Sequence, residues 1–520
     1  MNQPARPRTV VPLPLMTLAQ QLGAQQLGAQ QRGGRSLAAD PGAPVTGITL
    51  SSASVSPGDL YVGLPGSRTH GARYASVAAT AGAVAMLSDA EGAAMARDIG
   101  IEMPLLVVER PRSLLARAAA IVYGFPANRL TLIGVTGTQG KTTTTQLINA
   151  GLAAIGRRTA VIGSMGTWID GHRVESVLTT PEAPDLHALF ATMCEAGVDV
   201  CAMEVSSHSL VMGRVDGVVF DLAVFTNFGR DHLDFHAGVE DYFAAKASLF
   251  TPERATAALL NIDDDYIARL VRAPKIPTHT FSPSGAAADW RSVGANTSDG
   301  GSTFEVSGPA GHRIATSVRL DGQFNVANAL TAIAAIGEIG GDASAAAAGI
   351  AEVDAVPGRM ERIDRGQDFC VTVDYAHKPD AVSAALAALR HVIAGRLFVV
   401  IGAGGDRDRG KRPLMGEIAA RQADVVIVTD DNPRTEDAAA IRREVFIGAT
   451  GVAAAQVVDI ADRRGAIEHA LTTAGPGDAV LIAGKGQETG QQVNDEVLAF
   501  DDRLVATDIL DRLVKQRAAS

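Results

Sequence analysis

The chain has 520 residues, of which 47% are hydrophobic and 20% charged, and its formal net charge is −11. At roughly 150 residues per domain this length predicts about three domains, and the apolar content excludes wholesale disorder. The acidic balance, with no long Lys/Arg block, argues against nucleic acid as the main partner.

Two further features concern the compartment. The first 25 residues contain no sustained apolar stretch, and no later run is long enough to cross a bilayer. Cys194, Cys201 and Cys370 are scattered and form no CxxC pair, which fits a reducing compartment and neither a disulfide framework nor a zinc cluster. We therefore expect a cytoplasmic protein with no membrane insertion.

The N-terminal region divides into two parts. Residues 1–10 and the Gln/Gly/Ala-rich patch at 20–34 have low complexity, and we assign no chemistry to them. From Val45 onwards, short apolar runs with Gly/Pro punctuation alternate with Ala-rich helical segments. This pattern predicts a small α/β domain that begins near Val45 and completes a first domain at residues 1–127.

The central region begins with a buried strand, LTLIGVTG at 130–137, followed by a Gly-rich turn and a helix that starts at Lys141. Further apolar strands are predicted, with helical segments between them, at 159–165, 199–206, 218–227 and 257–263. The alternation predicts a mostly parallel sheet with helices on its faces. We place this central domain at residues 128–356.

After residue 356 the alternation restarts. Strands are predicted at 369–377, 396–405, 424–431 and 478–486, and each ends in a polar or Gly-rich segment. Ligands of open α/β sheets bind beyond the carboxyl ends of the strands. We therefore predict a Rossmann-like C-terminal domain, residues 357–520, with its own binding edge, and an α/β fold class with three domains.

The stretch GVTGTQGKTTTTQ, residues 134–146, resembles a phosphate-binding loop between a strand and a helix. Gly137 and Gly140 let the backbone approach an anion, and Lys141 can reach the outer phosphates. The hydroxyl of Thr142 is placed to hold Mg²⁺. The usual pattern requires glycine where the chain has Val135, so an ordinary Gly-rich turn stays open at this point.

A carboxylate and an imidazole also follow central strands. Glu204 lies at the carboxyl end of one apolar strand, in AMEVSSH, and His232 lies just beyond the next, in TNFGRDHLDFH. Side chains at neighbouring strand ends can share a cation with a bound phosphate. The alternative for each residue singly is an ordinary surface glutamate and a helix-capping histidine.

A set of motifs in a fixed order identifies a family. TGTQGKTTTT, TTPEAP, MEVSSH, FTNFGRDHLDFH, YFAAK, GQFNVAN, VPGRMER, DYAHKPD, GAGGDRDRGKR, DNPR and GKGQE follow one another from about Val45 to about residue 505. In this order they resemble the Mur ligases, most closely the MurE branch, the UDP-N-acetylmuramoyl-tripeptide synthetases. The family uses a shortened loop, TGTxGKT, which accounts for Val135.

The resemblance implies a central ATP site and a magnesium site. It implies catalytic roles for Lys141, Glu204, His232 and Lys246, and metal contacts from Thr142, Glu204, His232 and the carbamate of Lys246. An ammonium group cannot ligate a cation, whereas an N-carboxylated lysine, made from CO₂, presents two oxygens; an unmodified surface lysine is the alternative. The implied ATP contacts are Gly137, Thr138, Gln139, Gly140, Lys141, Thr142, Thr143, Asn325, Asn328, Arg359 and Asp374.

The resemblance also implies that the N-terminal domain holds the uridine nucleotide. The matching positions for the UDP-linked substrate are Leu50, Ser52, Ser67, Arg68, Thr69, Thr179, Thr180, Ser206 and Arg214. Two positions depart from the family pattern. Ala53 stands where many relatives have arginine, and Met212 stands where some have glutamine.

The DNPR motif indicates which amino acid is added. Arg434 follows a strand, and a guanidinium there can form a two-pronged bond with a carboxylate. In the family this arginine accompanies enzymes that add meso-diaminopimelate, and lysine-adding relatives usually lack it; pairing with Glu436 on the surface is the alternative. The matched pocket, in which Glu488 suits the distal ammonium and Gln487 replaces a frequent histidine, comprises Arg407, Asp431, Asn432, Pro433, Arg434, Gly484 and Glu488.

The implied activity is an ATP- and Mg²⁺-dependent ligation in cell-wall synthesis. It joins meso-diaminopimelate to the D-Glu γ-carboxylate of UDP-N-acetylmuramoyl-L-Ala-D-Glu through an acyl phosphate, and the expected partners of this monomer are small molecules only. The alternatives are the same ligation with L-lysine or another diamino acid, glutamate addition to folate, and a non-catalytic nucleotide-binding regulator. DNPR argues against lysine, and the uridine-type N-terminal domain argues against folate.

Overall fold

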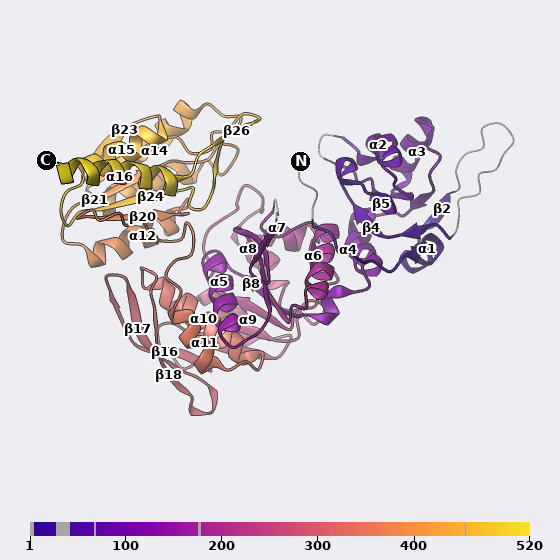
Figure 1. The fold of residues 1–520 in the computed structure, drawn as a ribbon, viewed down its shortest axis with the longest axis horizontal. Helices are drawn as coiled ribbons and strands as arrows, with labels where there is room; N and C mark the ends of the chain where they lie inside the picture. The colour runs from indigo at the N-terminus through magenta and orange to yellow at the C-terminus, as the bar shows by residue number, and fades with distance from the viewer. Residues whose placement is uncertain (1–4, 28–41, 67–68, 175–177, 453, 520) are drawn as a thin grey trace.

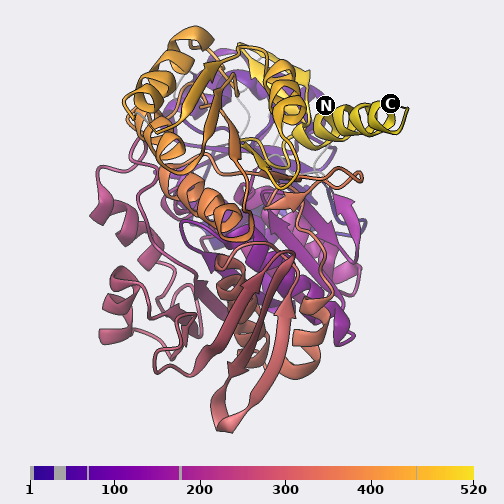
Figure 2. The same cartoon turned by 90° about the vertical axis from the view of Figure 1, so that its left-hand side faces the viewer.

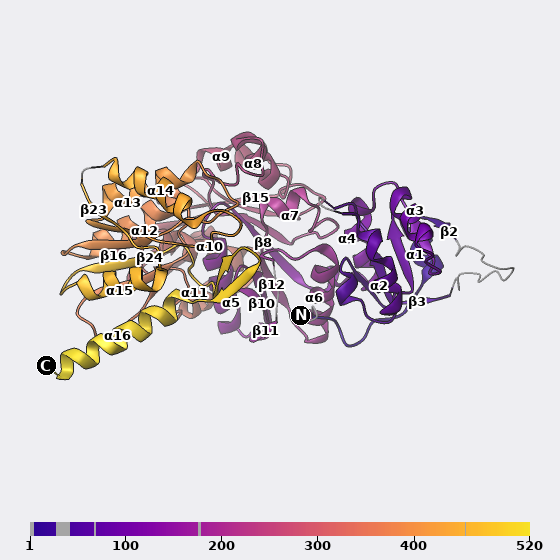
Figure 3. The same ribbon diagram turned by 90° about the horizontal axis from the view of Figure 1, so that it is seen from above.

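Three larger β-sheets follow one another along the described chain, and Figure 1 shows them in a row from the N-terminal to the C-terminal region. The computed structural model describes residues 5–27, 42–66, 69–174, 178–452 and 454–519. Within these ranges, no helix combines the length and the apolar character needed to span a bilayer. Seen from above, the central sheet lies between the other two regions (Figure 3).

The N-terminal region is a five-stranded sheet with helices on both faces. Only β2 is antiparallel to its neighbour, and the strand order is β2 (Gln25–Leu27), β7 (Leu105–Val107), β6 (Ala85–Ser88), β5 (Asp59–Val62) and β4 (Gly47–Thr49). One apolar cluster packs α1 (Leu15–Leu22) and α4 (Pro111–Val122) on the sheet, and another packs α2 (Ala75–Thr80) and α3 (Ala90–Asp98). Short 3₁₀ turns lie at η1 (Ser52–Ser54), η2 (Gly71–Tyr74) and η3 (Pro126–Arg129).

The expectation that this domain begins near Val45 is wrong. β1 (Leu13–Pro14) already pairs with β3 (Pro44–Val45), and α1 buries Leu15, Leu18 and Leu22 in the core. Strand β2 falls inside the Gln/Gly/Ala-rich patch and pairs with β7, whereas residues 28–34 of that patch lie outside the described residues. Apolar spacing at 15, 18 and 22 is the signal of a helix, and the low complexity of the neighbouring patch obscures it.

The residues before β1 connect the N-terminal sheet to the central region. Arg6 Nη1 lies 2.6 Å from Asp59 Oδ1, and Asp59 is buried at the start of β5. The backbone N–H groups of Arg8 and Thr9 donate to the carboxylate of Glu195 at 2.8 and 2.7 Å. Glu195 ends α6 (Ala183–Glu195), which belongs to the central region. Residues 6–9 therefore form a tether between the two regions.

Truncating Leu18 tests whether α1 is part of the N-terminal core. Leu18 is 0% exposed, and a Leu→Ala change in a packed core costs about 2–5 kcal/mol. We expect Leu18→Ala to lower the free energy of unfolding of the N-terminal domain by an amount in this range, measured by denaturant titration. Val11→Ala, at a position 83% exposed, is the control, and equal stability of both variants would contradict the packing.

The central sheet has eleven strands. The strands from β9 to β16 run parallel and the two margins antiparallel, in the order β11 (His172–Val174), β10 (Gly166–Ile169), β9 (Thr159–Gly163), β12 (Val200–Glu204), β8 (Thr131–Thr136), β13 (Leu222–Phe225), β14 (Ala258–Asn261), β15 (Thr278–Ser282), β16 (Trp290–Ser298), β17 (Gly301–Ser307) and β18 (Arg313–Val318). The predicted central strands and the mostly parallel sheet are confirmed. The antiparallel margins were not predicted.

Helices cover both faces of the central sheet. One apolar cluster packs the sheet against α5 (Lys141–Ala154), α10 (Phe324–Glu338) and α11 (Ala343–Ala351). The opposite cluster packs it against α6, α7 (Ser207–Val211), α8 (Val239–Ala247) and α9 (Asp265–Arg272). A short 3₁₀ turn, η4 (Pro309–Gly311), joins β17 to β18. In the side view, the strands β16–β18 lie below the C-terminal region (Figure 2). Arg362 of that region pairs with Asp299, in the turn between β16 and β17, at 2.5 Å.

The C-terminal region is a six-stranded sheet, parallel except for its first strand. The order is β19 (Glu361–Arg362), β20 (Cys370–Asp374), β24 (Ala479–Ala483), β21 (Leu397–Ile401), β22 (Val425–Val428) and β23 (Gln456–Asp459). One face carries α12 (Pro379–Val392), α13 (Lys411–Gln422) and α14 (Ala438–Thr450), and the other carries α15 (Arg463–Thr473) and α16 (Asp502–Ala519). The hairpin of β25 (Gly490–Val493) and β26 (Glu496–Ala499) lies beside it.

The four strands predicted for this region are confirmed as β20, β21, β22 and β24. The domain boundaries at 127/128 and 356/357 stay predictions. In the described parts of the chain, all strands of each larger sheet lie on the same side of each of these two positions. In the central sheet and in the C-terminal sheet, the parallel strands bring their carboxyl ends to one edge. Those edges carry the candidate site.

Candidate active site

The phosphate-type loop connects β8 to α5 and depends on two glycines. Gly137 has a φ of 148° and Gly140 a φ of 80°, values that side-chain-bearing residues rarely adopt. A β-carbon at Gly137 would lie 1.9 Å from Thr226 Oγ1, and one at Gly140 would lie 2.4 Å from Asn328 Oδ1. Both positions therefore require glycine for conformation and for space.

Asn227 holds the backbone of the loop in place. Its carbonyl accepts from the N–H of Thr138 at 2.9 Å, and its side-chain oxygen accepts from the N–H of Gln139, also at 2.9 Å. These two N–H groups are therefore engaged. The first N–H groups of α5, which begins at Lys141, have no partner within the helix. They are the backbone donors that can face an anion.

Two lysine ammonium groups converge on one backbone oxygen of this loop. Lys141 Nζ donates to Gly137 O at 2.7 Å, and Lys246 Nζ, from α8, donates to the same oxygen at 2.8 Å. Burial, followed by the nearby charge of Lys378, lowers the pKa of Lys141 to about 8. Burial and the charge of Lys141 also place the pKa of Lys246 well below its usual value. This crowding of cations favours an anionic ligand.

Glu204 faces the same loop from the end of β12. Its Oε1 accepts from Thr142 Oγ1 at 2.9 Å and from the N–H of Ser164 at 2.8 Å. Arg359 Nη2, from the C-terminal side, donates to Thr142 Oγ1 at 3.2 Å. The structure therefore brings Thr142, Glu204 and Arg359 together, as the predicted site requires.

His232 reaches the site differently from the prediction. Glu204 and His232 do not follow neighbouring strands, because β8 lies between β12 and β13. The ring of His232 lies against Asp231, with Nε2 3.0 Å from Oδ2, and burial is the main cause that lowers the pKa of His232. Lys378 forms an ion pair with the same Asp231 oxygen. Sequence analysis missed Asp231 and Lys378, although both lie in motifs that it quoted.

The two predicted asparagines lie at the start of α10, against the first turn of α5. Asn325 Nδ2 donates to Asp321 O at 2.8 Å, and Asn328 Nδ2 donates to Asn325 Oδ1 at 2.8 Å. Asn328 Oδ1 also accepts from Thr144 Oγ1 at 3.4 Å. Both side chains are thus placed beside the loop, with Asn328 in contact with the Gly140 position.

Asp374 shapes the backbone that presents Arg359. Its carboxylate accepts from the N–H groups of Met360 and Ala376 at 2.7 and 2.8 Å, and burial raises its pKa. The guanidinium of Arg359 lies 4.3 Å from the ring centre of Tyr375. Asp374 therefore positions Arg359 indirectly, because it holds the backbone next to Arg359.

The residues predicted to grip the sugar and peptide lie just behind Glu204. Thr180 Oγ1 donates to Glu204 O at 2.9 Å and accepts from the N–H of Ser206 at 3.3 Å. Arg214 Nη1 donates to Thr180 O at 3.2 Å. Met212 Sδ lies 3.3 Å from Arg214 Nη2, so the residue that departs from the family pattern still contacts the guanidinium. Thr179 Oγ1 is 3.5 Å from Ser164 Oγ.

The predicted uridine contacts lie in the N-terminal sheet, apart from the phosphate loop. Leu50 and Ser52 follow β4, and Figure 1 shows β4 well separated from β8. The hydroxyl of Thr69 is buried and has no hydrogen-bond partner among the described residues. Ser67 and Arg68 lie outside the described residues.

Three adjacent strands of the C-terminal sheet deliver the predicted amino-acid pocket. Arg407 follows β21, Asp431 to Arg434 follow β22, and Gly484 and Glu488 follow β24. Arg434 Nη1 donates to Gly405 O at 2.7 Å, and burial and then the charge of Arg407 lower its pKa. The two guanidinium groups thus lie near each other.

Pairing of Arg434 with Glu436, the alternative from the sequence, is not what the structure shows. Glu436 is held instead by Arg412 at 2.8 Å and Arg409 at 2.9 Å. The backbone of Arg434 adopts a φ of 53° and is fixed by β25, because its N–H donates to Gln492 O and its carbonyl accepts from the N–H of Asn494. The side chain of Arg434 is therefore available to a ligand.

The polar residues of this pocket form one network. Asn432 Nδ2 donates to Glu488 Oε2 at 2.9 Å, and Lys485 Nζ donates to Asn432 Oδ1 at 3.0 Å. Gly484 has a φ of 116°, and a β-carbon there would lie 2.6 Å from Asp431 Oδ2. Sequence analysis did not select Lys485, although it lies inside the quoted motif GKGQE.

Comparison with known proteins agrees with this arrangement. Residues 44–128 match the catalytic domain of the Mur ligase family, residues 135–336 the Mur ligase middle domain, and residues 358–486 the Mur ligase glutamate ligase domain. A protein of Streptomyces avermitilis named UDP-N-acetylmuramoyl-L-alanyl-D-glutamate--2,6-diaminopimelate ligase is 49% identical over 515 residues, 98% of each chain. The chain belongs to the Mur ligase family.

Two further relatives extend the likeness. A protein of Corynebacterium glutamicum with the same name is 46% identical over 469 residues, 88% of this chain and 90% of its own. A solved structure of a UDP-N-acetylmuramoyl-L-alanyl-D-glutamate--2,6-diaminopimelate ligase is 30% identical, with a TM-score of 0.65, and covers 97% of this chain and 100% of its own. Mur ligases are ATP-dependent ligases that form carbon–nitrogen bonds, and this Mur ligase is therefore such an enzyme.

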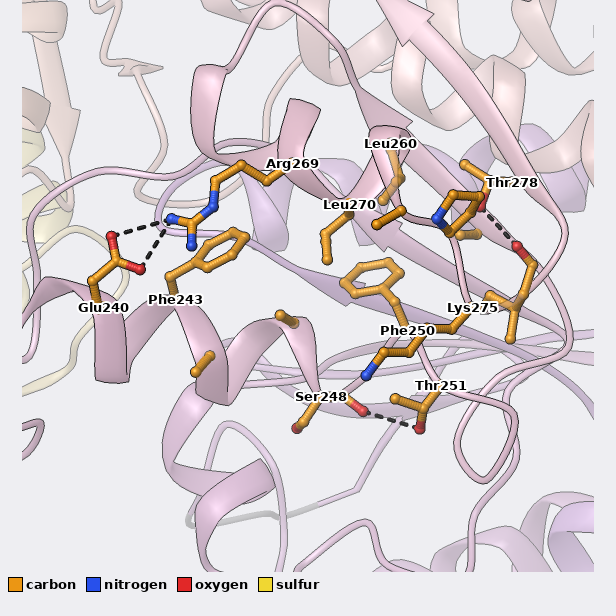
Figure 4. A pocket seen from close by; sticks show the side chains of 16 residues that line it. Glu240, Phe243, Ser248, Phe250, Thr251, Leu260, Arg269, Leu270, Lys275 and Thr278 are labelled. Carbon is orange, nitrogen blue, oxygen red and sulfur yellow. Dashed lines mark hydrogen bonds and ion pairs between the residues drawn. The ribbon is translucent and has the colours of Figure 1, made fainter.

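A separate cavity lies on the other side of α8 in this Mur ligase. It has a volume of about 390 Å³ and is lined mainly by apolar side chains of α8, of the segment that follows α8, of β14 and of α9. These side chains include Phe243, Phe250 and Leu270 (Figure 4). Glu240 and Arg269 pair at its rim. None of the predicted site residues lines it, so the polar groups at the sheet edges define the candidate active site.

Substitution of Gly140 tests the phosphate loop. An alanine β-carbon would meet Asn328 Oδ1 at 2.4 Å and force a φ of 80° on a side-chain-bearing residue. We expect Gly140→Ala to weaken ATP binding by at least about tenfold, because a shift of roughly 1.4 kcal/mol suffices for that factor. Calorimetric titration of ATP measures it.

Gly156→Ala is the matched control for this experiment. Gly156 follows the other end of α5 with a φ of 77°, and nothing lies within 4 Å of the place that a β-carbon would take there. The variant meets a similar backbone strain of about 1–2 kcal/mol but no clash, so it should bind ATP as the wild type does. Equal ATP affinities for both variants would contradict the role of Gly140.

Proposed function

We propose that this Mur ligase joins meso-diaminopimelate to the D-Glu γ-carboxylate of UDP-N-acetylmuramoyl-L-Ala-D-Glu in peptidoglycan precursor synthesis. The observation that carries the proposal is the pair of guanidinium groups, Arg407 and Arg434, beside the carboxylates of Asp431 and Glu488. A guanidinium binds a carboxylate with two hydrogen bonds, and a carboxylate binds an ammonium group. A diamino acid with a second carboxylate fits this arrangement, and relatives that are 46–49% identical carry the corresponding name.

ATP is proposed to bind with its phosphates on the loop at 137–143. Three cationic side chains lie around this loop, because the charges of Lys378 and Arg359 act on Lys141. These cations attract the negatively charged triphosphate. The γ-phosphate of ATP then lies within reach of Lys141. Thr143, another of the proposed ATP contacts, lies in the first turn of α5.

The site also suits Mg²⁺, which prefers oxygen ligands. The Thr142 hydroxyl and the Glu204 carboxylate already lie within hydrogen-bond distance of each other, so their oxygens converge beside the loop. We propose that these two residues, His232 and a carbamate on Lys246 would hold the metal, which would neutralise charge on the phosphate oxygens. The Nε2 of His232 lies 3.0 Å from Asp231 Oδ2.

Burial of Lys246 supports its carbamylation. The side chain is 1% exposed, and its lowered pKa favours the neutral amine, the form that adds to CO₂. The product carries two oxygens and a negative charge. It would therefore place an anion beside the ammonium group of Lys141, which shares Gly137 O with Lys246.

The reaction proceeds in two steps. An oxygen of the D-Glu γ-carboxylate attacks the γ-phosphorus of ATP, the bond to the β–γ bridging oxygen breaks, and an acyl phosphate and ADP result. Lys141 stabilises the charge that develops on the phosphoryl oxygens. The neutral amine of diaminopimelate then attacks the acyl carbon, phosphate leaves, and the nitrogen loses a proton to give the amide.

Positioning supplies much of the rate in such a reaction. Arg359, which contacts Thr142, and Gln487, whose Nε2 donates to Ser164 O at 3.4 Å, join the amino-acid pocket to the phosphate site. These contacts support a closed arrangement in which amine and acyl phosphate meet. We propose that the enzyme works in the cytoplasm as a monomer on small-molecule substrates.

The experiment that tests the function is phosphate release from ATP and Mg²⁺ with UDP-N-acetylmuramoyl-L-Ala-D-Glu. The assay compares meso-diaminopimelate, L-lysine and L-ornithine, and mass spectrometry identifies the products. We expect turnover with meso-diaminopimelate, because only this amine has the second carboxylate. Preference for lysine or ornithine would overturn the specificity, and no product with any amine would favour a non-catalytic nucleotide-binding protein.

Arg434→Ala tests the carboxylate contact in the same assay. Loss of a charged hydrogen-bond partner costs about 1.5–3 kcal/mol, so kcat/KM for meso-diaminopimelate should fall by roughly 10- to 150-fold. The KM for ATP should stay unchanged. Arg421→Ala removes an exposed arginine that pairs with Glu417 and serves as the control. A wild-type kcat/KM in Arg434→Ala would refute the contact.

The carbamate is tested by nuclear magnetic resonance after incubation with ¹³C-bicarbonate. We expect one carbamate carbonyl signal in the wild type that is absent from Lys246→Met, because burial lowers the pKa of Lys246 well below its usual value. Lys275→Met, at an exposed lysine, should retain the signal. A signal that persists in Lys246→Met would assign the modification elsewhere.

A further inference from the structure

A fully buried lysine lies beneath the amino-acid pocket. The side chain of Lys485 is 0% exposed, and its Nζ lies 3.0 Å from Asn432 Oδ1, 3.4 Å from Glu488 Oε2 and 4.0 Å from Asp431 Oδ1. An ammonium group removed from water is costly unless it is hydrogen-bonded and paired. The two carboxylates and the amide oxygen supply these partners, so the lysine and the pocket carboxylates depend on one another.

Lys485 changes the net charge of the pocket. We define the pocket charges as those of Arg407, Asp431, Arg434, Lys485 and Glu488. Three are cations and two are carboxylates, so one positive charge remains uncompensated. Without Lys485 the same pocket would be neutral.

Further charged groups surround the pocket. Arg463 and Asp502 form a fully buried ion pair at 2.6 Å beside it. Glu436 is held by Arg412 and Arg409, and Arg412 also pairs with Glu444. The charge of Asp406 acts on Arg434, and that of Asp431 acts on Lys411. Removal of Lys485 makes the pocket more negative by one charge, because all these neighbours stay in place.

This charge matches one class of amino acid. A diamino dicarboxylic acid that is ready to react has two carboxylates, one distal ammonium and one neutral amine, hence a net charge of −1. L-Lysine in the same state has one carboxylate and one ammonium, hence no net charge. The positive charge of Lys485 therefore attracts the dicarboxylic acid, whose net charge is −1, more strongly than it attracts lysine, whose net charge is zero.

We propose that Lys485 is a specificity-determining residue that makes the pocket select a dicarboxylic diamino acid over a monocarboxylic one. It acts through its partners, since it cancels one of the two carboxylates and orients Asn432 and Glu488. The Glu488 side chain is 34% exposed, so its carboxylate faces outwards to the distal ammonium while Lys485 stays beneath. The inference rests on the proposed function, because it concerns the amine of that reaction.

The test compares kcat/KM for meso-diaminopimelate and for L-lysine in Lys485→Met, which removes the charge and keeps most of the volume. We expect the ratio of the value for meso-diaminopimelate to the value for L-lysine to fall by at least about tenfold, because loss of one positive charge weakens the attraction for the amine with net charge −1 more than for the neutral one. A merely structural role lowers both values together, and an unchanged ratio would overturn the inference. Lys275→Met, at an exposed lysine, is the control and should keep the wild-type ratio.

A double variant covers the case in which Lys485→Met does not fold. Lys485→Met with Glu488→Gln removes one cation and one carboxylate, so the pocket keeps its single positive charge. We expect its ratio to lie closer to that of the wild type than to that of a neutral pocket, although both kcat/KM values fall. A ratio that favours lysine in the double variant would overturn the inference. Absence of turnover in the wild type with every amine would instead overturn the proposed function.

Discussion

The phosphate site depends on one backbone oxygen, that of Gly137, which accepts hydrogen bonds from two lysines at once. Bringing two ammonium groups together away from water is unfavourable by itself, and burial lowers the pKa of both. The surrounding structure makes the arrangement possible. Gly137 and Gly140 provide the backbone conformation, and Asn227 fixes it from the end of β13. A ligand or a modification that carries negative charge therefore stabilises such a site.

The amino-acid pocket follows the same principle with different groups. Its cations, Arg407, Arg434 and Lys485, come from the ends of three adjacent parallel strands of one sheet. In the proposed function, the cations at the phosphate loop face a triphosphate, whereas those of this pocket face a carboxylate whose geometry a guanidinium matches. The two sites meet where Arg359 contacts Thr142 and Gln487 contacts Ser164. In the proposed function, complementary charges therefore favour binding of both the nucleotide and the amine, and the two sites adjoin at these contacts.

Much of this architecture could be predicted from the sequence, because apolar runs and Gly-rich turns report local structure directly. The strand and helix around 130–156 and the four C-terminal strands are examples. Strand order is different, since it depends on contacts between distant segments. For this reason the sequence suggests neighbouring strands for Glu204 and His232, although β8 separates them.

Other errors come from composition and from burial. A patch rich in Gln, Gly and Ala looks unstructured, yet part of it pairs as β2 with β7, a strand far along the chain. Lys485 and Asp231 lie within motifs that the sequence singled out. Their roles follow from depth below the surface and from the partners that surround them, which no single sequence states.

The tether at residues 6–9 has a practical consequence for anyone who handles this enzyme. Arg6 is bound to the N-terminal sheet and Thr9 to α6 of the central region, so this short segment restricts how far the two regions can turn relative to each other. A recombinant form trimmed to residue 44, where the family match begins, would lose both attachments together with α1. An affinity tag therefore belongs after α16, whose end lies away from the N-terminus (Figure 3).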